Sequence, residues 1–168
     1  MRRIAAITRN PLAVALVAML AVAGCANKQT PNNPADLGLG GGAGGAPGSS
    51  QDFTVNVGDR IFFDTDSSVI RADAQTTLAR QAQWLQQYGS YAITVEGHAD
   101  ERGTREYNLA LGARRAAAAR DFLVARGVPV NRIRTISYGK ERPVAVCDNI
   151  SCWSQNRRAV TVLSGAGS

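Results

Sequence analysis

The chain has 168 residues and a formal net charge of +6, a length that predicts one domain of ordinary size plus additional segments. The sequence pI near 9.8 would be compatible with a nucleic-acid partner, but Arg2, Arg3 and Arg9 lie in a segment that we expect to be removed. Without them, the number of Lys and Arg residues falls from 19 to 16 against 13 acidic residues, which leaves a net charge of +3. Aromatic residues make up only 6% and form no stacking platform, so we exclude a nucleic-acid partner.

Residues 1–24 have the parts of a secretory signal peptide: the three arginines, an apolar stretch from Pro11 to Ala23, and small residues at the end. The apolar stretch is shorter than the roughly 20 residues that a transmembrane helix needs. The sequence Val22-Ala23-Gly24-Cys25 resembles the bacterial lipobox. This resemblance implies cleavage before Cys25, diacylglycerol on its thiol and an acyl chain on its amine, with no other cofactor. The alternative is a simple signal peptide followed by an unrelated cysteine.

The residue after Cys25 is Ala26 rather than Asp, which by resemblance to enterobacterial lipoproteins implies sorting to the outer membrane, with the folded domain facing the periplasm. From Ala26 to Ser50 the chain contains three prolines, a glycine-rich run over 38–48 and almost no large apolar residues. Such a stretch cannot bury enough surface to offset its ordering entropy, so it predicts a flexible linker with a root-mean-square reach of about 25–30 Å. The predicted parts are a signal peptide (1–24), a lipidated N-terminus with linker (25–51) and a folded domain (52–168).

Strands and helices alternate after the linker. Alternating Phe53, Val55 and Val57 predict a strand that continues to Asp64. One helix is expected over 71–88 and ends at Gly89. A second is expected from a Thr104 cap to Arg126 and ends at Gly127. Further strands are expected over 91–98, 132–138 and 158–163. The order βαβαββ predicts an α/β (α+β) sandwich in which the helices pack on one mixed sheet.

Polar side chains of several kinds come together around the start of the second helix. At about 100° per residue, Asn108, Leu111 and Arg115 fall within about 60° on one helix face. Asp100 lies in the loop that leads into that helix. The predicted site therefore offers a carboxylate, a guanidinium group, an amide and one apolar contact.

These residues lie in two motifs, Val95–Thr104 and Tyr107–Ala116, that resemble the OmpA-like peptidoglycan-binding family. Further matching pieces are Phe63-Asp64, Ser137–Pro143 and Asn156–Val160, so the resemblance runs from about residue 54 to 163. It is closest to the lipid-anchored members that work in the Tol-Pal system. The resemblance implies peptidoglycan as the ligand, TolB and other Tol proteins as partners, and a tethering role in envelope integrity and cell division. It implies these ligand-binding residues: Asp64, Asp100, Thr104, Asn108, Leu111, Arg115 and Arg158.

The family ligand, diaminopimelate, ends in both an ammonium and a carboxylate group. Arg115 can bind the carboxylate with two hydrogen bonds, and Asp100 can bind the ammonium. A ligand with only one of these charges would leave a partner unpaired, which gives selectivity. The alternative is a structural ion pair between Asp100 and Arg115. Arg114, Glu101 and Arg102 are interpreted as exposed charges.

His98 is the only histidine, and with Glu96 and Asp100 it suggests a metal or acid–base site, because strand alternation puts the three on one face. One histidine with carboxylates is a poor zinc set, however, and no nucleophile–base motif is recognisable. We therefore expect no metal and no enzymatic activity. A wall hydrolase remains the enzymatic alternative, and a lipoprotein of a virulence or secretion system remains the alternative within the family.

Cys147 and Cys152 follow near the C-terminal end. In an oxidising periplasm a local disulfide between them is expected. Free thiols and a metal-binding pair are the alternatives. Trp153 beside them is interpreted as a packing residue.

Overall fold

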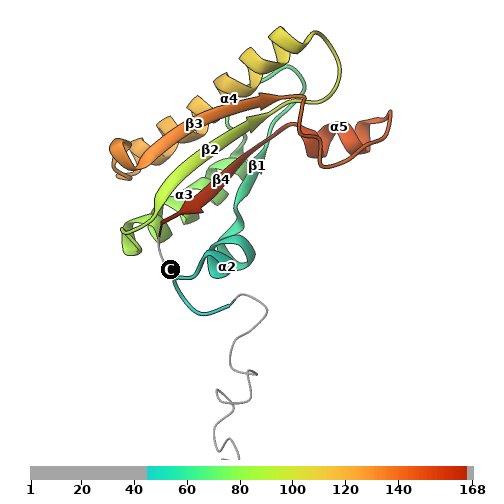
Figure 1. Ribbon diagram of the computed structural model, residues 1–168. Helices are drawn as coiled ribbons and strands as arrows, with labels where there is room; N and C mark the ends of the chain where they lie inside the picture. Colours follow the sequence, from blue (N-terminus) through green and yellow to red (C-terminus); the bar gives the residue numbers. More distant parts are fainter. Residues whose placement is uncertain (1–44, 166–168) are drawn as a thin grey trace, which may run out of the picture. The chain divides into compact units, whose positions relative to one another are not determined.

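The computed structural model describes residues 45–165 (Figure 1). The predicted signal peptide, the predicted lipidation site Cys25 and the predicted linker up to residue 44 lie outside the described residues. Within residues 45–165, no helix is both long and apolar enough to cross a membrane.

A four-stranded mixed sheet forms the centre of the domain. Its strands are β1 (Arg60–Phe62), β2 (Ala92–His98), β3 (Ile133–Gly139) and β4 (Arg158–Ser164), in the order β1-β4-β2-β3. β2 pairs in parallel with β3 and antiparallel with β4, and β1 pairs antiparallel with β4. The predicted fold class is thereby confirmed.

Two helices, α3 (Ala72–Gln87) and α4 (Arg105–Ala125), pack on the same face of this sheet (Figure 1). The Thr104 hydroxyl caps α4 by accepting a hydrogen bond from the Tyr107 amide at 3.2 Å. At the other end, the amides of Gly127 and Val128 donate to the carbonyls of Val124 and Leu123 at 2.9 and 3.1 Å, respectively. Gly127 has a φ of +94°, the left-handed conformation that this helix stop requires. The predicted cap and stop of α4 are both confirmed.

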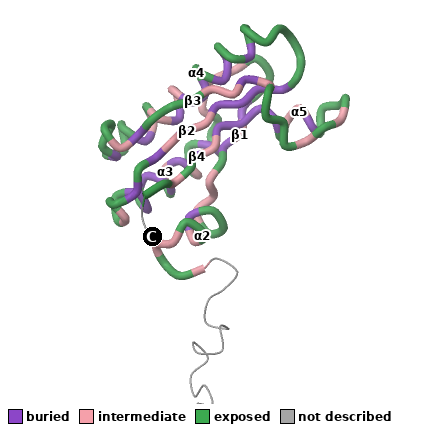
Figure 2. The backbone as a smooth tube through the Cα atoms, viewed as in Figure 1, coloured by how far each residue is buried: buried purple, intermediate pink, exposed green. Residues whose placement is uncertain are grey.

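The core lies between the helices and the sheet, and buried segments follow the inner strands and the sheet-facing sides of α3 and α4 (Figure 2). Leu78 and Leu85, seven residues apart on α3, are both fully buried. Gly97 on β2 and Gly112 on α4 bring the helix backbone against the strand, because a Cβ added at Gly97 would lie 1.8 Å from the Gly112 oxygen. This contact fixes the height of α4 above the sheet next to the loop that carries Asp100.

The strand predicted from Phe53 is wrong over its first half. The chain there forms a short helix, α2 (Ser50–Asp52), and a π-helical turn, η1 (Phe53–Gly58), before β1 begins at Arg60. The Asp52 carboxylate accepts hydrogen bonds from the Trp84 indole and the Gly48 amide, both at 2.9 Å, and so fixes this turn against α3. Only Phe53 of the alternating apolar residues is buried; Val55 is 51% exposed, so the alternation does not reflect a sheet face.

A further helix, α5 (Ile150–Asn156), was not predicted. It is short, and its start is marked only by Asn149, whose side chain accepts from the Ser151 amide at 2.9 Å. Cys147 and Cys152 form the expected disulfide, with their Cα atoms 5.7 Å apart, and attach α5 to the loop before it. This confirmed disulfide places the next residue, Trp153, beside the loop that follows β2.

Candidate functional site

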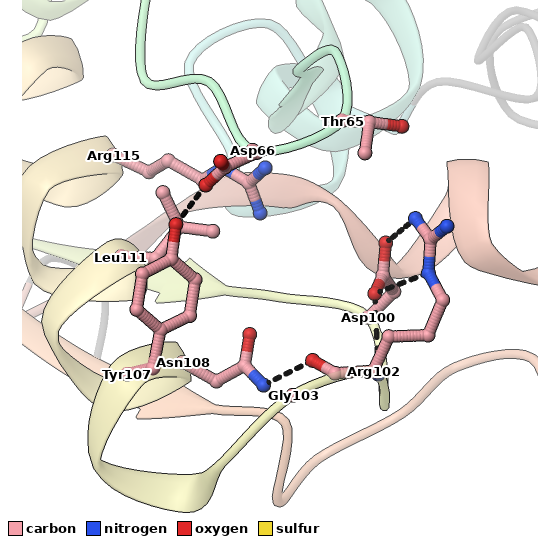
Figure 3. A pocket seen from close by; sticks show the side chains of 9 residues that line it. All are labelled: Thr65, Asp66, Asp100, Arg102, Gly103, Tyr107, Asn108, Leu111 and Arg115. Carbon is pink, nitrogen blue, oxygen red and sulfur yellow. Dashed lines mark hydrogen bonds and ion pairs between the residues drawn. The ribbon is translucent and has the colours of Figure 1, made fainter.

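A pocket of about 240 Å³ lies where three segments meet: the loop after β1, the loop after β2, and the first half of α4 (Figure 3). Four of the predicted ligand residues line it: Asp100, Asn108, Leu111 and Arg115. The other lining residues are Thr65, Asp66, Arg102, Gly103 and Tyr107. The predicted helix face is therefore confirmed as one wall of a pocket, with the loop of Asp100 as the opposite wall.

Arg115 is held by backbone carbonyls. Its Nε donates to Ser67 O at 2.8 Å, Nη1 to His98 O at 2.8 Å, and Nη2 to Asp64 O at 3.1 Å. The side chain has 0% of its surface exposed. A guanidinium group has five N–H donors, so one N–H on each Nη atom is left over after these three bonds.

The charge of Arg115 is not neutralised by an ion pair. Among the described residues, no carboxylate oxygen lies within 4.0 Å of its nitrogens. Burial lowers the pKa of Arg115 to about 10, against the opposing field of Asp100, so the group remains a cation at neutral pH. The alternative of a structural ion pair between Asp100 and Arg115 is therefore wrong. A buried cation of this kind suits an anionic ligand.

Asp100 has other partners. Its Oδ2 accepts from Arg102 Nη2 at 2.8 Å and Arg157 Nη1 at 3.3 Å, and its Oδ1 accepts from Arg102 Nε at 3.1 Å. Burial alone would raise the pKa of Asp100, but the hydrogen bonds from Arg102 and Arg157 outweigh it and hold the pKa below its ordinary value. The carboxylate is therefore ionised and faces the same pocket as the Arg115 guanidinium.

The remaining walls are set by side chains of α4. Asn108 Nδ2 donates to the carbonyls of Arg102 at 2.7 Å and Thr104 at 3.1 Å, which leaves its amide oxygen directed into the pocket (Figure 3). The Tyr107 hydroxyl donates to the Asp66 carboxylate beside Arg115 (Figure 3). Both Tyr107 and Asp66 are exposed, so this bond lies at the surface of the site.

Three of the predicted ligand residues do not line the pocket. The Asp64 side chain is 70% exposed and pairs with Arg71 at 3.2 Å, although its carbonyl helps to hold Arg115. Thr104 uses its hydroxyl as the cap of α4. Arg158 is buried elsewhere and donates to the carbonyls of Arg142 and Asn156.

Sequence reasoning missed Arg157, which contacts Asp100, and chose its neighbour Arg158. β4 begins at Arg158, so the two adjacent side chains point in different directions. It also interpreted Arg102 only as an exposed charge and overlooked Tyr107 and Asp66. The presence of Tyr107 one residue before Asn108 on the same helix turn was the available signal.

The suggested cluster of Glu96, His98 and Asp100 does not form. His98 Nε2 lies 3.5 Å from a Glu96 oxygen, but β2 ends at His98 and the chain then turns Asp100 into the pocket. Over residues 45–165, no group of three His, Cys, Asp or Glu side chains is arranged to hold a metal ion. His98 is buried against Tyr138, with ring centres 5.6 Å apart.

Comparison with known proteins matches this architecture to one family. Residues 62–157 match the model of the OmpA family. A peptidoglycan-associated lipoprotein of Mesorhizobium japonicum is 82% identical over 168 residues and covers 100% of both chains. The protein of the same description from Pseudomonas aeruginosa is 39% identical over 151 residues, covering 84% of this chain and 89% of its own.

Solved structures agree with the sequence relatives. The crystal structure of the peptidoglycan-associated lipoprotein from Burkholderia pseudomallei superposes with a TM-score of 0.62 at 42% identity, covering 63% of this chain and 90% of that one. The C-terminal domain of Helicobacter pylori MotB gives a TM-score of 0.59 at 27% identity, covering 63% and 84%. The chain belongs to the OmpA family and, within it, to the peptidoglycan-associated lipoproteins.

Proposed function

We propose that this protein binds peptidoglycan non-covalently through the pocket of Asp100 and Arg115, and that it tethers the outer membrane to the cell wall. The observation that supports this most directly is a buried Arg115 cation, without a carboxylate within 4.0 Å among the described residues, facing the same pocket as an ionised carboxylate. The names of its relatives, peptidoglycan-associated lipoproteins, point to the same ligand.

The ligand group that we propose is the free end of diaminopimelate. Its carboxylate would accept the two N–H groups of Arg115 that the backbone carbonyls leave over, as charge-assisted hydrogen bonds. Its ammonium would approach Asp100, and the Asn108 oxygen and Leu111 would contact the chain between them. Asp64 and Thr104 act indirectly, through the carbonyl that holds Arg115 and through the cap of α4.

Access to Arg115 needs a small movement, because the free domain leaves none of its surface exposed. The Tyr107–Asp66 hydrogen bond lies directly beside the guanidinium group (Figure 3). Both side chains are exposed, so they can rotate without disturbing the core. We assign them the role of a surface cover that opens for the ligand.

The wall-binding proposal is tested by co-sedimentation of the purified protein with peptidoglycan sacculi. Asp100→Asn should weaken binding at least about tenfold, because the ligand ammonium loses its counter-charge. Asp121→Asn removes the same charge from an exposed position near the far end of α4 and should bind like wild type. Equal binding by all three proteins would refute the site.

Arg115→Ala is a poor test of the site, because it would leave the carbonyls of Asp64, Ser67 and His98 without their donor and destabilise the fold. Muropeptides in the same supernatants address the enzymatic alternative. We propose that the protein is not an enzyme; release of muropeptides above the level of the buffer control would show a wall hydrolase instead.

The anchor and the partners complete the proposal. Cys25 would hold the protein in the outer membrane, and the predicted linker that begins at Ala26 would let the domain reach the cell wall. Labelling with radioactive palmitate should modify the wild type and not Cys25→Ser. Membership of the Tol-Pal system predicts that crosslinking in cells recovers TolB, whereas recovery of secretion-system components without TolB would support the alternative assignment.

A further inference from the structure

In the free domain, the Asp100 carboxylate already accepts as many hydrogen bonds as it can. A carboxylate has about four acceptor positions, and Asp100 receives four hydrogen bonds: three from Arg102, through its amide, Nε and Nη2, and one from Arg157. An ammonium group that enters the pocket therefore finds no free acceptor on Asp100. The two halves of the site differ, since Arg115 still has free donors whereas Asp100 has no free acceptor.

Of these two arginines, Arg102 is the one whose side chain can move away from Asp100. Its side chain is 41% exposed, whereas that of Arg157 is 8% exposed and also donates to the Phe63 carbonyl at 3.1 Å. If Arg102 departs, Arg157 remains 3.3 Å from Oδ2, so the buried carboxylate keeps a counter-charge. The departure exposes a carboxylate face toward the pocket without leaving an unpaired buried ion.

Only the side chain of Arg102 is free to move, because the backbone around it is fixed. Asn108 donates to the Arg102 carbonyl at 2.7 Å. Lys140 Nζ donates to the carbonyls of Glu101 at 3.1 Å and Gly103 at 2.7 Å. Displacement of Arg102 from Asp100 is therefore a rotation of one side chain rather than an opening of the loop.

A second contact, on the outer side, holds Arg102 in place. Its guanidinium carbon lies 4.2 Å from the centre of the Trp153 ring, a cation–π contact. The Trp153 indole donates to the Glu101 carboxylate, which fixes the ring orientation, and the Cys147–Cys152 disulfide ends at the preceding residue. Trp153 does not line the pocket, so it acts on the site through Arg102.

We propose that the Arg102 guanidinium is an internal substitute for the ligand ammonium: it occupies Asp100 in the free domain and must be displaced when diaminopimelate binds, while Trp153 positions it there. This rests on the proposed binding of diaminopimelate at Asp100. Arg102 and Trp153 are thus positioning residues that set the affinity and selectivity of the site. A ligand without the second amine has no group to exchange for Arg102 and gains nothing at Asp100.

The consequence for affinity follows from competition. The apparent dissociation constant is the intrinsic one divided by the fraction of molecules in which Asp100 is free. Arg102→Met keeps the methylene stem but removes every side-chain N–H donor. It should tighten binding of a soluble Ala–Glu–diaminopimelate tripeptide about three- to tenfold in isothermal titration calorimetry. Arg105→Met, which removes an exposed arginine three residues further along that pairs with Glu141 outside the pocket, should leave the affinity unchanged.

A matched ligand makes the test specific. The same tripeptide with aminopimelate keeps the terminal carboxylate but lacks the second amine, and Arg102→Met should not tighten its binding. Weaker binding of the diaminopimelate peptide by Arg102→Met would show that Arg102 contacts the ligand and would overturn the inference. Asp100→Asn separates the two proposals: if it binds the peptide as tightly as wild type, the proposed function itself fails.

Substitution of Trp153 provides an independent test of the inference. Trp153→Leu should tighten binding of the diaminopimelate peptide in the wild-type background, because Arg102 loses its outer contact. In the Arg102→Met background the same substitution should change nothing, since no guanidinium remains to be held. An equal effect of Trp153→Leu in both backgrounds would show that Trp153 acts on the ligand directly or through the fold, and would overturn its assigned role.

Discussion

Replacement of Gly97 by alanine should lift α4 away from the sheet and disrupt the site without touching any residue that lines it. The added Cβ would lie 1.8 Å from the Gly112 oxygen and 2.6 Å from the Gly112 carbonyl carbon. Both atoms belong to the backbone of α4, so no rotation of a side chain can relieve the contact. The helix has to move by about 1 Å or more before the contact becomes tolerable.

The expected cost is large for a single methyl group. Overpacking in a core typically lowers the free energy of unfolding by about 1–3 kcal/mol. Because the contact at Gly97 is between two rigid backbones, the cost of Gly97→Ala should lie at the upper end of this range or above. Domains of this size are stable by about 5–15 kcal/mol, so the protein should still fold. Because Asn108 and Arg115 stand on α4 and Asp100 follows β2, the shift should also change the distance between the two walls and weaken binding to sacculi.

Urea denaturation followed by tryptophan fluorescence, together with sacculus co-sedimentation, measures both effects. Gly89→Ala is the control, because a Cβ there meets no heavy atom within 4 Å and should change the stability by less than about 0.5 kcal/mol. Should Gly97→Ala unfold at the same urea concentration as Gly89→Ala, the close approach of β2 and α4 would be refuted as a determinant of the site.

Three further predictions concern stability. Cys147→Ser with Cys152→Ser should lower the free energy of unfolding in urea by about 2 kcal/mol, since the disulfide closes a short loop. Burial, followed by the charges of Arg158 and Arg142, lowers the pKa of His98 to about 4, so between pH 6.5 and 4 the unfolded chain binds a proton that the folded domain does not. Stability should therefore be complete above pH 6.5 and fall by up to about 3 kcal/mol toward pH 4, a slope that His98→Gln should flatten. Arg132→Ala should cost about 1–3 kcal/mol in the same urea titration, because its guanidinium donates to the carbonyls of Leu85, Tyr88 and Tyr91, whereas the exposed Arg134→Ala should cost almost nothing.

The helices and inner strands were predictable because their signals are local. Leu78 and Leu85 mark the buried side of α3, and Thr104 and Gly127 mark the ends of α4 within one residue. The same local reasoning failed at Phe53, where the pattern that suggested a strand belongs to a turn fixed by a contact with Trp84. Alternation over five residues cannot distinguish a strand from such a turn when the deciding contact lies in another element.

The chemistry of the pocket was predictable only as a set of residue types. The spacing of Asn108, Leu111 and Arg115 defines a helix face, which a single sequence reveals. The contacts that determine how Arg115 behaves come from carbonyls 17 to 51 residues away, and no side-chain pattern encodes them. The partner of Asp100 at Arg157 is 57 residues away, and the family resemblance implied its neighbour Arg158 instead, although the start of β4 at Arg158 was predicted correctly.

The two walls of the pocket are built for different tasks. Arg115 is fixed by three segments of the fold, so its free donors are oriented before a ligand arrives, and little entropy is lost when a carboxylate binds. Asp100 instead exchanges one cation for another, so the gain on that side is only the difference between the ligand ammonium and Arg102. The rigid Arg115 side of the pocket gives recognition, and the exchangeable Asp100 side limits affinity. If the protein is tethered as proposed, the anchored linker would give a high effective concentration of its cell-wall ligand, on the order of millimolar, so a modest affinity would suffice for occupancy and still permit release.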